Sequence, residues 1–429
     1  RQPIGRRWYR VKTFSYSLVS VIDSSTSAVL DRLLSHRQGF PALAGKQYFN
    51  YGGQGPMAQA TLEAIFAAHR QVQELGPFSG AANQWVSAEA VQTRGAIAAE
   101  LGTTADTITL TEDVTVGCNI PLWGIPWQAG DHMLLSDCEH PGIIAAVQEI
   151  CRRFGVSYSL CPLLETVNSD DDAAAVAVVA AHLRPNTRLL VISHVFWNTG
   201  QVLPLEGIVQ VCRDRPRPVL TLVDAAQSVG SLPLDLPALG VDFYAFTGHK
   251  WWCGPAGLGG LYVRPEAREH LAPTFIGWRG ITTDAAANPT GWKPNGQRYE
   301  VATSNYPLLA GLRTAIASQA EWGSAAQRYQ RLVELAQRLW SQLQELPQIR
   351  PVRQSPPDSG LVSFWILDQG EPSPAWHKRL VDELEAQGVY LRTLQAPNCV
   401  RACTHYLTLE SEVDELVGAI AATLKRGLD

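Results

Sequence analysis

The sequence predicts an α/β fold, with a mostly parallel seven-stranded sheet in a large domain and a smaller α+β domain at the C-terminal end. Short apolar runs such as 189–193 alternate with helix-like segments between about residues 60 and 265. Strands that are apolar throughout are typical of parallel sheets covered by helices on both faces. After about residue 310 this alternation ends, which indicates a second domain. The 429 residues are 46% hydrophobic and 17% charged, so the chain can bury a large core.

The alternation defines the elements of the first domain. The expected helices are 59–75, 84–101, 116–122, 142–154, 171–183 and 205–214. The expected strands are 107–111, 132–136, 156–161, 188–193, 218–224, 242–246 and 258–263. Parallel neighbours need long crossovers, and the helices between the strands supply them.

The C-terminal part has a different pattern. We expect a long helix over 310–346, strands near 360–366 and 389–393, a helix near 375–387 and a final helix at 410–425. The loop-rich stretch 265–308, which mixes Gly, Pro, Asn and Trp, has the length of a functional loop.

Four segments follow from these patterns. They are a loose N-terminal extension (1–35), a segment that joins the small domain or bridges to the large one (36–55), a large domain (56–308) and a small domain (309–429). A targeting segment is conceivable in 1–35 because acids are absent before Asp23, but serines interrupt its apolar run, which argues against a secretory signal.

Composition excludes several classes of function. The net charge is −5 and no long basic run occurs, which argues against nucleic-acid binding. No apolar stretch reaches the roughly 18 residues of a membrane span. The eight cysteines form no C-x-x-C pair, so we expect reduced thiols in a cytoplasmic protein and no metal site. Cys399 and Cys403 lie near His405, but no second pair completes a tetrahedral set.

The candidate site residues follow the ends of predicted strands, where ligands of parallel sheets bind. Asp224 ends one strand, Gln227 comes three residues later and Lys250 follows the next strand. Pyridoxal phosphate (PLP) needs a lysine amine for its Schiff base and a carboxylate that keeps its pyridine nitrogen protonated. Lys250 and Asp224 therefore predict PLP as the cofactor, with Gln227 turned toward its phenolic oxygen. As an alternative, Asp224 is a helix cap or loop acid.

Other polar residues at the same edge have functional and structural interpretations. His140 is a candidate to stack on the pyridine ring and to move protons near the substrate, or else an ordinary loop histidine. Asn198 is a second candidate for the phenolic oxygen, or a turn residue before Gly200. The candidates for phosphate binding are Thr115, Thr247 and His249, each of which could instead be a cap or turn residue.

A substrate carboxylate requires a cationic partner. Arginine binds carboxylates through two parallel hydrogen bonds, and Arg392 and Arg401 are the best candidates. Their alternative interpretation is a pair of surface arginines.

These motifs together resemble a known family. The runs 224–227 (Asp-Ala-Ala-Gln) and 247–250 (Thr-Gly-His-Lys) resemble the class V aminotransferase-like group of fold-type I PLP enzymes, which includes the cysteine desulfurases. The segments 76–79, 137–144, 197–204 and 246–251 are more similar still to the cyst(e)ine C–S lyases of that group, and the resemblance spans roughly residues 37–427.

The resemblance implies specific roles. Lys250 would carry the cofactor and remove the α-proton, Asp224 would pair with the pyridine nitrogen, and His140 would stack on the ring and act near the sulfur. Arg401 would bind the substrate carboxylate, with Arg392 on the neighbouring strand. The family forms homodimers in which a partner threonine contacts the phosphate, and Thr303 matches that position, although Ala302 replaces the usual glycine. An iron–sulfur acceptor protein is a further implied partner.

The expected reaction is β-elimination from L-cystine or L-cysteine, giving pyruvate, ammonia and a persulfide or sulfide, with supply of sulfur to iron–sulfur clusters as one use. One alternative is a cysteine desulfurase that uses Cys399 as persulfide carrier. Desulfurases typically carry Arg-x-Gly-x-x-Cys here, whereas Cys399 lies on a short loop two residues before Arg401. Further alternatives are an epimerase or transaminase of the same group, and a non-catalytic scaffold that keeps only the fold.

Overall fold

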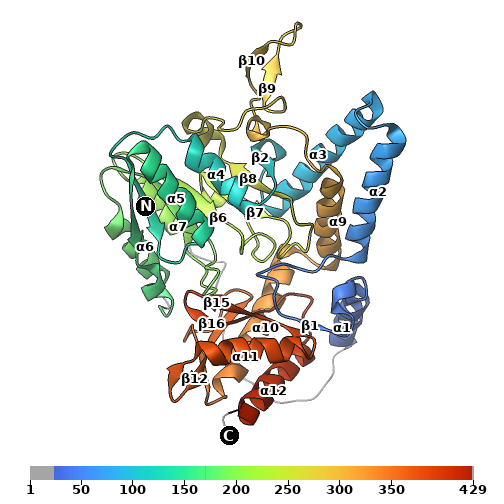
Figure 1. Ribbon diagram of the computed structural model, residues 1–429, viewed down its shortest axis with the longest axis vertical. Coiled ribbons are helices and arrows are strands. Elements are labelled where there is room, and N and C mark those ends of the chain that lie inside the picture. Colours follow the sequence, from blue (N-terminus) through green and yellow to red (C-terminus); the bar gives the residue numbers. More distant parts are fainter. Residues whose placement is uncertain (1–23, 170, 428–429) are drawn as a thin grey trace.

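The computed structural model describes residues 24–169 and 171–427, and its larger part is a seven-stranded sheet (Figure 1). The strand order is β2-β8-β7-β6-β5-β3-β4. The pairs from β7 to β4 are parallel, whereas β8 runs antiparallel to both of its neighbours. The strands are β2 (Ile108–Thr111), β3 (His132–Ser136), β4 (Ser157–Cys161), β5 (Thr187–Ser193), β6 (Leu220–Asp224), β7 (Phe243–Thr247) and β8 (Gly259–Val263). All seven lie within two residues of the predicted strands, and the fold-class prediction is confirmed.

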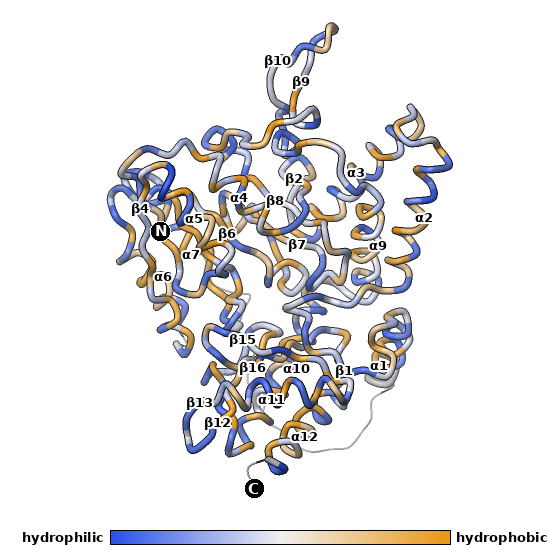
Figure 2. The backbone as a smooth tube through the Cα atoms, viewed as in Figure 1, coloured by the Kyte–Doolittle hydropathy of each residue, from blue (hydrophilic) through white to orange (hydrophobic). Residues whose placement is uncertain are grey.

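Helices cover both faces of this sheet. They are α2 (Gln59–Leu75), α3 (Gly80–Glu100), α4 (Val114–Gly124), α5 (Pro141–Phe154), α6 (Asp172–His182), α7 (Leu205–Arg213), α8 (Leu236–Leu239) and α9 (Pro307–Trp322). Successive side chains of β3 enter different cores, with Leu134 facing the core of α3, α6, α7 and α9 and Leu135 facing that of α4 and α5. This two-sided burial explains the continuous apolar runs (Figure 2).

The smaller part is an antiparallel sheet with the order β11-β12-β16-β15. Its strands are β11 (Ile349–Pro351), β12 (Leu361–Asp368), β15 (Arg392–Gln395) and β16 (Asn398–Cys403), and β13 (Glu371–Pro372) pairs with β12. The helices α10 (Ala325–Gln344), α11 (Pro374–Glu385) and α12 (Glu410–Gly427) pack on it through a separate core that includes Leu339, Phe364, Leu380 and Leu416.

One prediction for the C-terminal part was wrong. The expected helix over 310–346 is two helices, because Ser324 begins α10 with a capping box in which its amide donates to the Gln327 side chain at 2.9 Å. The sequence Ser-x-x-Gln carried that signal. Helix α9 packs on α2 and α3 and adds Leu309 and Leu312 to the core of the large sheet. Most of α9 lies beyond residue 308, the predicted end of the large domain. Strand β16 was not predicted, and it carries both Cys399 and Arg401.

The N-terminal segment connects the two parts. Within the expected extension 1–35, the described residues from Ser24 onward form α1 (Ser24–Arg37), and the rest lies outside the described residues. Strand β1 (Gln47–Tyr48) pairs with β14 (Val389–Tyr390). The exact domain boundaries stay a prediction.

The loop-rich stretch contains one regular feature. Strands β9 (Ile281–Thr283) and β10 (Pro289–Trp292) form a hairpin that projects from the large domain (Figure 1). No helix among the described residues is long and apolar enough to cross a bilayer.

Candidate active site

The carboxyl ends of β6, β5 and β7 meet at one edge of the large sheet, and the predicted residues lie there. Asp224 ends β6 and is the register partner of Ser193 on β5 and of Ala245 on β7. Lys250 follows β7 by three residues, and His140 begins α5 after β3. The parallel order of the strands therefore collects side chains that lie up to 110 positions apart in the chain.

Lys250 lies in a turn that neighbouring segments hold in place. The amide of Cys253 donates to the Lys250 carbonyl at 2.9 Å, and the amide of Gly55 donates to the His249 carbonyl at 2.8 Å. A Cβ on Gly55 would lie 2.1 Å from the Lys250 oxygen, so only glycine fits there. Burial lowers the pKa of Lys250 to about 8, against the opposing charge of Asp224. The amine is therefore neutral far more often than that of an exposed lysine.

Asp224 is a buried carboxylate, with 6% of its surface exposed. Burial raises its pKa, while a hydrogen bond from the Ala226 amide (2.9 Å) and the charges of Lys250 and His140 oppose that shift. No ion pair involves Asp224 within the described part of the chain. A buried anion of this kind fits a cationic ring nitrogen, which is the partner that the sequence predicted.

Gln227 is fixed at both ends of its amide. Its Nε2 donates to the Gly52 carbonyl and its Oε1 accepts from the Trp251 indole, both at 2.9 Å. One N–H of Nε2 remains for a ligand oxygen. Asn198 donates to the Ala396 carbonyl at 2.9 Å, while its Oδ1 is buried without a partner among the described residues.

His140 caps α5 and is exposed on the edge of the site. Its Nδ1 accepts a hydrogen bond from the Gly142 amide at 3.2 Å, so the proton of the neutral ring lies on Nε2. Burial of the ring lowers the pKa of His140, although the charge of Asp224 raises it. The ring meets Trp197 edge-on with centroids 5.7 Å apart. The charges of Asp224, Lys250 and Arg392 all act on this imidazole.

The predicted phosphate ligands lie on two adjoining segments. Thr247 and His249 hydrogen-bond to each other (Oγ1 to Nδ1, 2.6 Å). Thr115 is exposed in the first turn of α4, where Asp113 already caps the Val116 amide at 2.8 Å. The charge of Asp113 also acts on His249, so the two segments are neighbours. A helix N-terminus beside a threonine and a histidine suits a phosphate group.

Arg401 and Arg392 are register partners on β16 and β15. Only 1% of Arg401 is exposed; its Nη1 donates to the Trp197 carbonyl at 2.7 Å, while Nε and Nη2 have no partner among the described residues. Arg392 is exposed, and its pKa is lowered by burial of the guanidinium and by the charge of Arg401. Like charges placed opposite each other are unfavourable unless an anion joins them, so the pair fits carboxylate binding.

The remaining candidates are Cys399 and Thr303. Cys399 is fully buried on β16 in a cluster with Val352 and Leu394, and burial raises the pKa of its thiol to about 12. Such a thiol is a poor nucleophile. Thr303 is exposed beyond the site, and its service to a partner chain stays a prediction.

Several neighbours of the site were missed by sequence reasoning. Trp197 contacts His140 through its ring and Arg401 through its carbonyl, and a Cβ on Gly52 would lie 3.0 Å from Arg401 Nη2. The glycines of the run 52–55 were the signal for this close approach.

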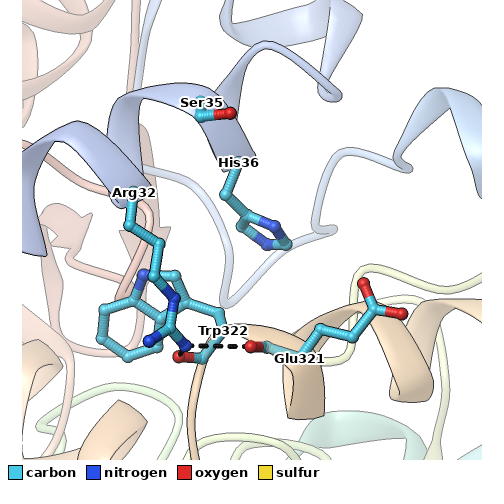
Figure 3. A pocket seen from close by; sticks show the side chains of 5 residues that line it. All are labelled: Arg32, Ser35, His36, Glu321 and Trp322. Atoms are coloured by element: carbon cyan, nitrogen blue, oxygen red, sulfur yellow. Dashed lines mark hydrogen bonds between the residues drawn. The ribbon is translucent and has the colours of Figure 1, made fainter.

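Metal and surface features do not add a second centre. No group of three or more metal-ligating side chains occurs among the described residues, and all eight cysteines are free thiols. A cleft of about 280 Å³ between α1 and the end of α9 is lined by Arg32, Ser35, His36, Glu321 and Trp322 (Figure 3). Arg32 donates there to the Glu321 carbonyl at 2.9 Å, and none of the predicted site residues lines the cleft.

The family model for class-V aminotransferases matches residues 59–417, a span that contains most of the predicted site. The chain belongs to the class-V aminotransferase family. One relative of this chain, the isopenicillin N epimerase of Streptomyces clavuligerus, is 30% identical to it over 385 residues (87% of this chain, 94% of the relative). A probable cysteine desulfurase of Xylella fastidiosa (strain 9a5c) is 31% identical over 345 residues (78% and 79%).

Solved structures give a closer match. The cystine C–S lyase C-DES, in complex with its reaction product cysteine persulfide, is 50% identical to this class-V family member. That match covers 89% of this chain and 99% of C-DES, with a TM-score of 0.85. A C-DES mutant with glycine covalently linked to the PLP cofactor is 49% identical, with a TM-score of 0.86 over 90% and 98% of the two chains.

Proposed function

We propose that this chain is a PLP-dependent lyase that cleaves the Cβ–S bond of L-cystine and releases pyruvate, ammonia and cysteine persulfide. The predicted cofactor and the predicted carbon–sulfur lyase chemistry are confirmed by the family and by C-DES. The preference for cystine is the new part, and one observation carries it. Two arginines face each other at the site, and the Nε and Nη2 of the buried one have no partner in the part of the chain that the structure describes.

Two cationic groups suit a substrate with two carboxylates. Cystine carries an α-carboxylate at each end, whereas cysteine carries one. Arg401 is buried and fixed by Trp197, so it is the better anchor for the carboxylate next to the reacting carbon. Arg392 is exposed and would hold the distal carboxylate, which reduces the repulsion between the two guanidinium groups.

When bound, PLP supplies an electron sink for the negative charge that develops at Cα. Lys250 Nζ would hold the cofactor and then take the Cα proton, for which a pKa of about 8 suits a base at neutral pH. Asp224 would keep the ring nitrogen protonated. The Nε2–H of His140 would be the donor to the developing thiolate or persulfide, because Nδ1 is occupied by the Gly142 amide.

The leaving group also favours cystine. The Cβ–S bond breaks with its electron pair on sulfur, so a lower thiol pKa makes a better leaving group. A persulfide is more acidic than hydrogen sulfide and leaves more readily. The aminoacrylate that remains takes up water and yields pyruvate and ammonia, so one cystine and one water balance the three products.

Product analysis tests this function. Pyruvate, ammonia and sulfane sulfur should appear in equal amounts with cystine, and kcat/KM for cysteine should be lower. Racemised substrate without pyruvate would instead support the epimerase alternative. Alanine and sulfane sulfur would support the desulfurase alternative, which the buried Cys399 thiol disfavours. A purified protein that stays colourless with added PLP would support the scaffold alternative.

A homodimer is the second part of the proposal. Phe275, Ile276 and Trp278 are exposed apolar side chains in the loop before β9. A Cβ on Gly277 would lie 2.0 Å from the Val301 carbonyl, so this apolar surface adjoins the segment of Thr303. Exposed apolar surfaces of this kind mark interfaces. Mixing inactive Lys250→Ala chains with inactive Thr303→Ala chains tests whether Thr303 completes the partner's site. Hybrid dimers should then regain activity, and no recovery would contradict this role of Thr303.

A cytoplasmic location and a sulfur acceptor complete the proposal. Eight free thiols favour a reducing compartment. The persulfide product is a sulfur donor that suits iron–sulfur cluster assembly. Transfer of labelled sulfur to an apo iron–sulfur acceptor protein would test this use.

A further inference from the structure

Glu139 is a buried acid that neither the mechanism nor the motifs account for. It lies between β3 and His140, with 4% of its surface exposed. Its Oε1 accepts a hydrogen bond from the Ser193 amide at 2.9 Å, and its Oε2 accepts one from the Ser193 hydroxyl at 2.8 Å. The hydroxyl of Ser136 also donates to Oε1. Three donors and no ion-pair partner among the described residues indicate an anion held by hydrogen bonds.

The contacts of Glu139 connect the two ends of the catalytic site. Ser193 is the register partner of Asp224, so their side chains lie on the same face of neighbouring strands. The carboxylate of Glu139 binds that serine side chain, which places it close to Asp224. On its other side, Glu139 is covalently joined to His140.

Among the described residues, no lysine or arginine forms an ion pair with Glu139. Burial and the charge of Asp224 raise the pKa of Glu139 to about 7, and the hydrogen bonds from Ser136 and Ser193 limit this rise. The neighbouring titratable groups are Cys118 on α4, Cys161 on β4, Cys138 and Asp137 in its own turn, Asp224 on β6, and His140. Burial raises the pKa of the thiols of Cys118, Cys138 and Cys161, so these thiols are neutral.

We propose that Glu139 is a positioning residue that ties the His140 turn to the Asp224 strand and adds a second buried negative charge behind the cofactor ring. It does not touch the cofactor. It acts through Ser193 on the alignment of His140 with Asp224, and its charge stabilises cationic groups at Lys250 and at the ring nitrogen. This inference rests on the proposed PLP-dependent function.

The test separates charge from shape. Glu139→Gln keeps the shape and an acceptor for the Ser193 amide but removes the charge. Glu139→Asp keeps the charge but shortens the reach. The matched control is Glu89→Gln, because Glu89 is also a buried acid (6% exposed), is bound to Arg313 at 2.7 Å and lies on α3 away from the site.

The first readout is the pH titration of the visible absorbance of the PLP-loaded protein, recorded from pH 8 upward, where most of Glu139 is ionised. Loss of a nearby negative charge lowers the pKa of a cation, so Glu139→Gln should shift the midpoint down by roughly 0.5 to 1 pH unit. Glu139→Asp and Glu89→Gln should stay within about 0.2 unit of the native protein. With cystine, Glu139→Gln should lower kcat about tenfold and change KM less than about twofold.

The second readout needs no cofactor. In the PLP-free protein, the pKa of Lys250 measured by NMR, about 8 in the native protein, should fall in Glu139→Gln and stay unchanged in Glu89→Gln. If Glu139→Gln fails to fold, Ser193→Ala keeps the charge and loosens the turn, so it should lower kcat without moving the midpoint. The inference is overturned if the folded Glu139→Gln protein has native absorbance and Lys250 titrations, or if Ser193→Ala has native kcat. A loss of the proposed function itself would instead appear as absent pyruvate formation by the native protein.

Discussion

Arg401 provides the sharpest test, because its guanidinium is buried and only partly satisfied. It keeps one hydrogen bond, to the Trp197 carbonyl, while Nε and Nη2 lack partners among the described residues. We expect these two groups to bind the α-carboxylate. Arg401→Lys keeps the charge but replaces the fork by a point donor. A hydrogen bond to a charged group contributes about 1.5–3 kcal/mol, so loss of one should lower kcat/KM for cystine roughly 10- to 150-fold.

Replacing Arg401 should lower activity without lowering the stability of the fold. A buried cation without a carboxylate is unfavourable in the substrate-free protein, and apolar replacement of buried ionic groups is often neutral or stabilising by about 1–4 kcal/mol. Loss of the bond to Trp197 costs about 1.5 kcal/mol. Arg401→Met should therefore leave the free energy of unfolding unchanged or raise it by up to about 2 kcal/mol, while activity is lost.

Arg328 is the matched control for this prediction. It is equally buried (2% exposed), but it is paired with Glu100 at 2.5 Å and donates to the Gly323 carbonyl at 2.7 Å. Arg328→Met leaves Glu100 without its cation and should destabilise the fold by about 3–5 kcal/mol. Urea unfolding and pyruvate formation measure both effects. The reasoning fails if Arg401→Met destabilises as much as Arg328→Met, or if Arg401→Lys keeps native kcat/KM.

Three further predictions concern other groups. Cys399→Ser should retain pyruvate formation within about twofold, because the thiol is buried away from solvent; loss of turnover would support the desulfurase alternative. PLP should enter the PLP-free protein faster as pH rises through about 8, the pKa of Lys250. At pH 7.5 about a quarter of such amines are neutral, roughly 200-fold more than for an ordinary lysine, so an incorporation midpoint near pH 10 would contradict the assignment. Burial lowers the pKa of both His194 and His405 to about 3. Unfolding therefore takes up protons below pH 6.5, and stability, present in full above that pH, should fall by about 1.4 kcal/mol per pH unit for each ring. The acid limb of the His194→Asn, His405→Asn double variant should be shallower by about 2.7 kcal/mol per pH unit, and an unchanged slope would exclude this cause.

The strands of the large sheet could be predicted because their signal is local. A run such as Leu189–Ser193 is apolar at every position, and both of its faces are buried by helices. Asp224 and Lys250 could be predicted for a related reason: parallel strands place their carboxyl ends at one edge whatever the strand order. The helix break at Ser324 was equally local and was overlooked.

The sequence by itself determined the α/β class, the strand ends that carry the chemistry, and a lysine, an aspartate and two arginines as candidates. Only the tertiary structure decided that Arg401 faces Arg392 across a strand pair, that Cys399 is buried beside them, and that Glu139 reaches Ser193 behind Asp224. Periodicity reports the neighbours of a residue along the chain. The pairing of β15 with β16, and of β5 with β6, depends on burial summed over the whole domain. The same packing decides which buried polar groups have no partner, and such groups distinguish a binding site from an ordinary surface.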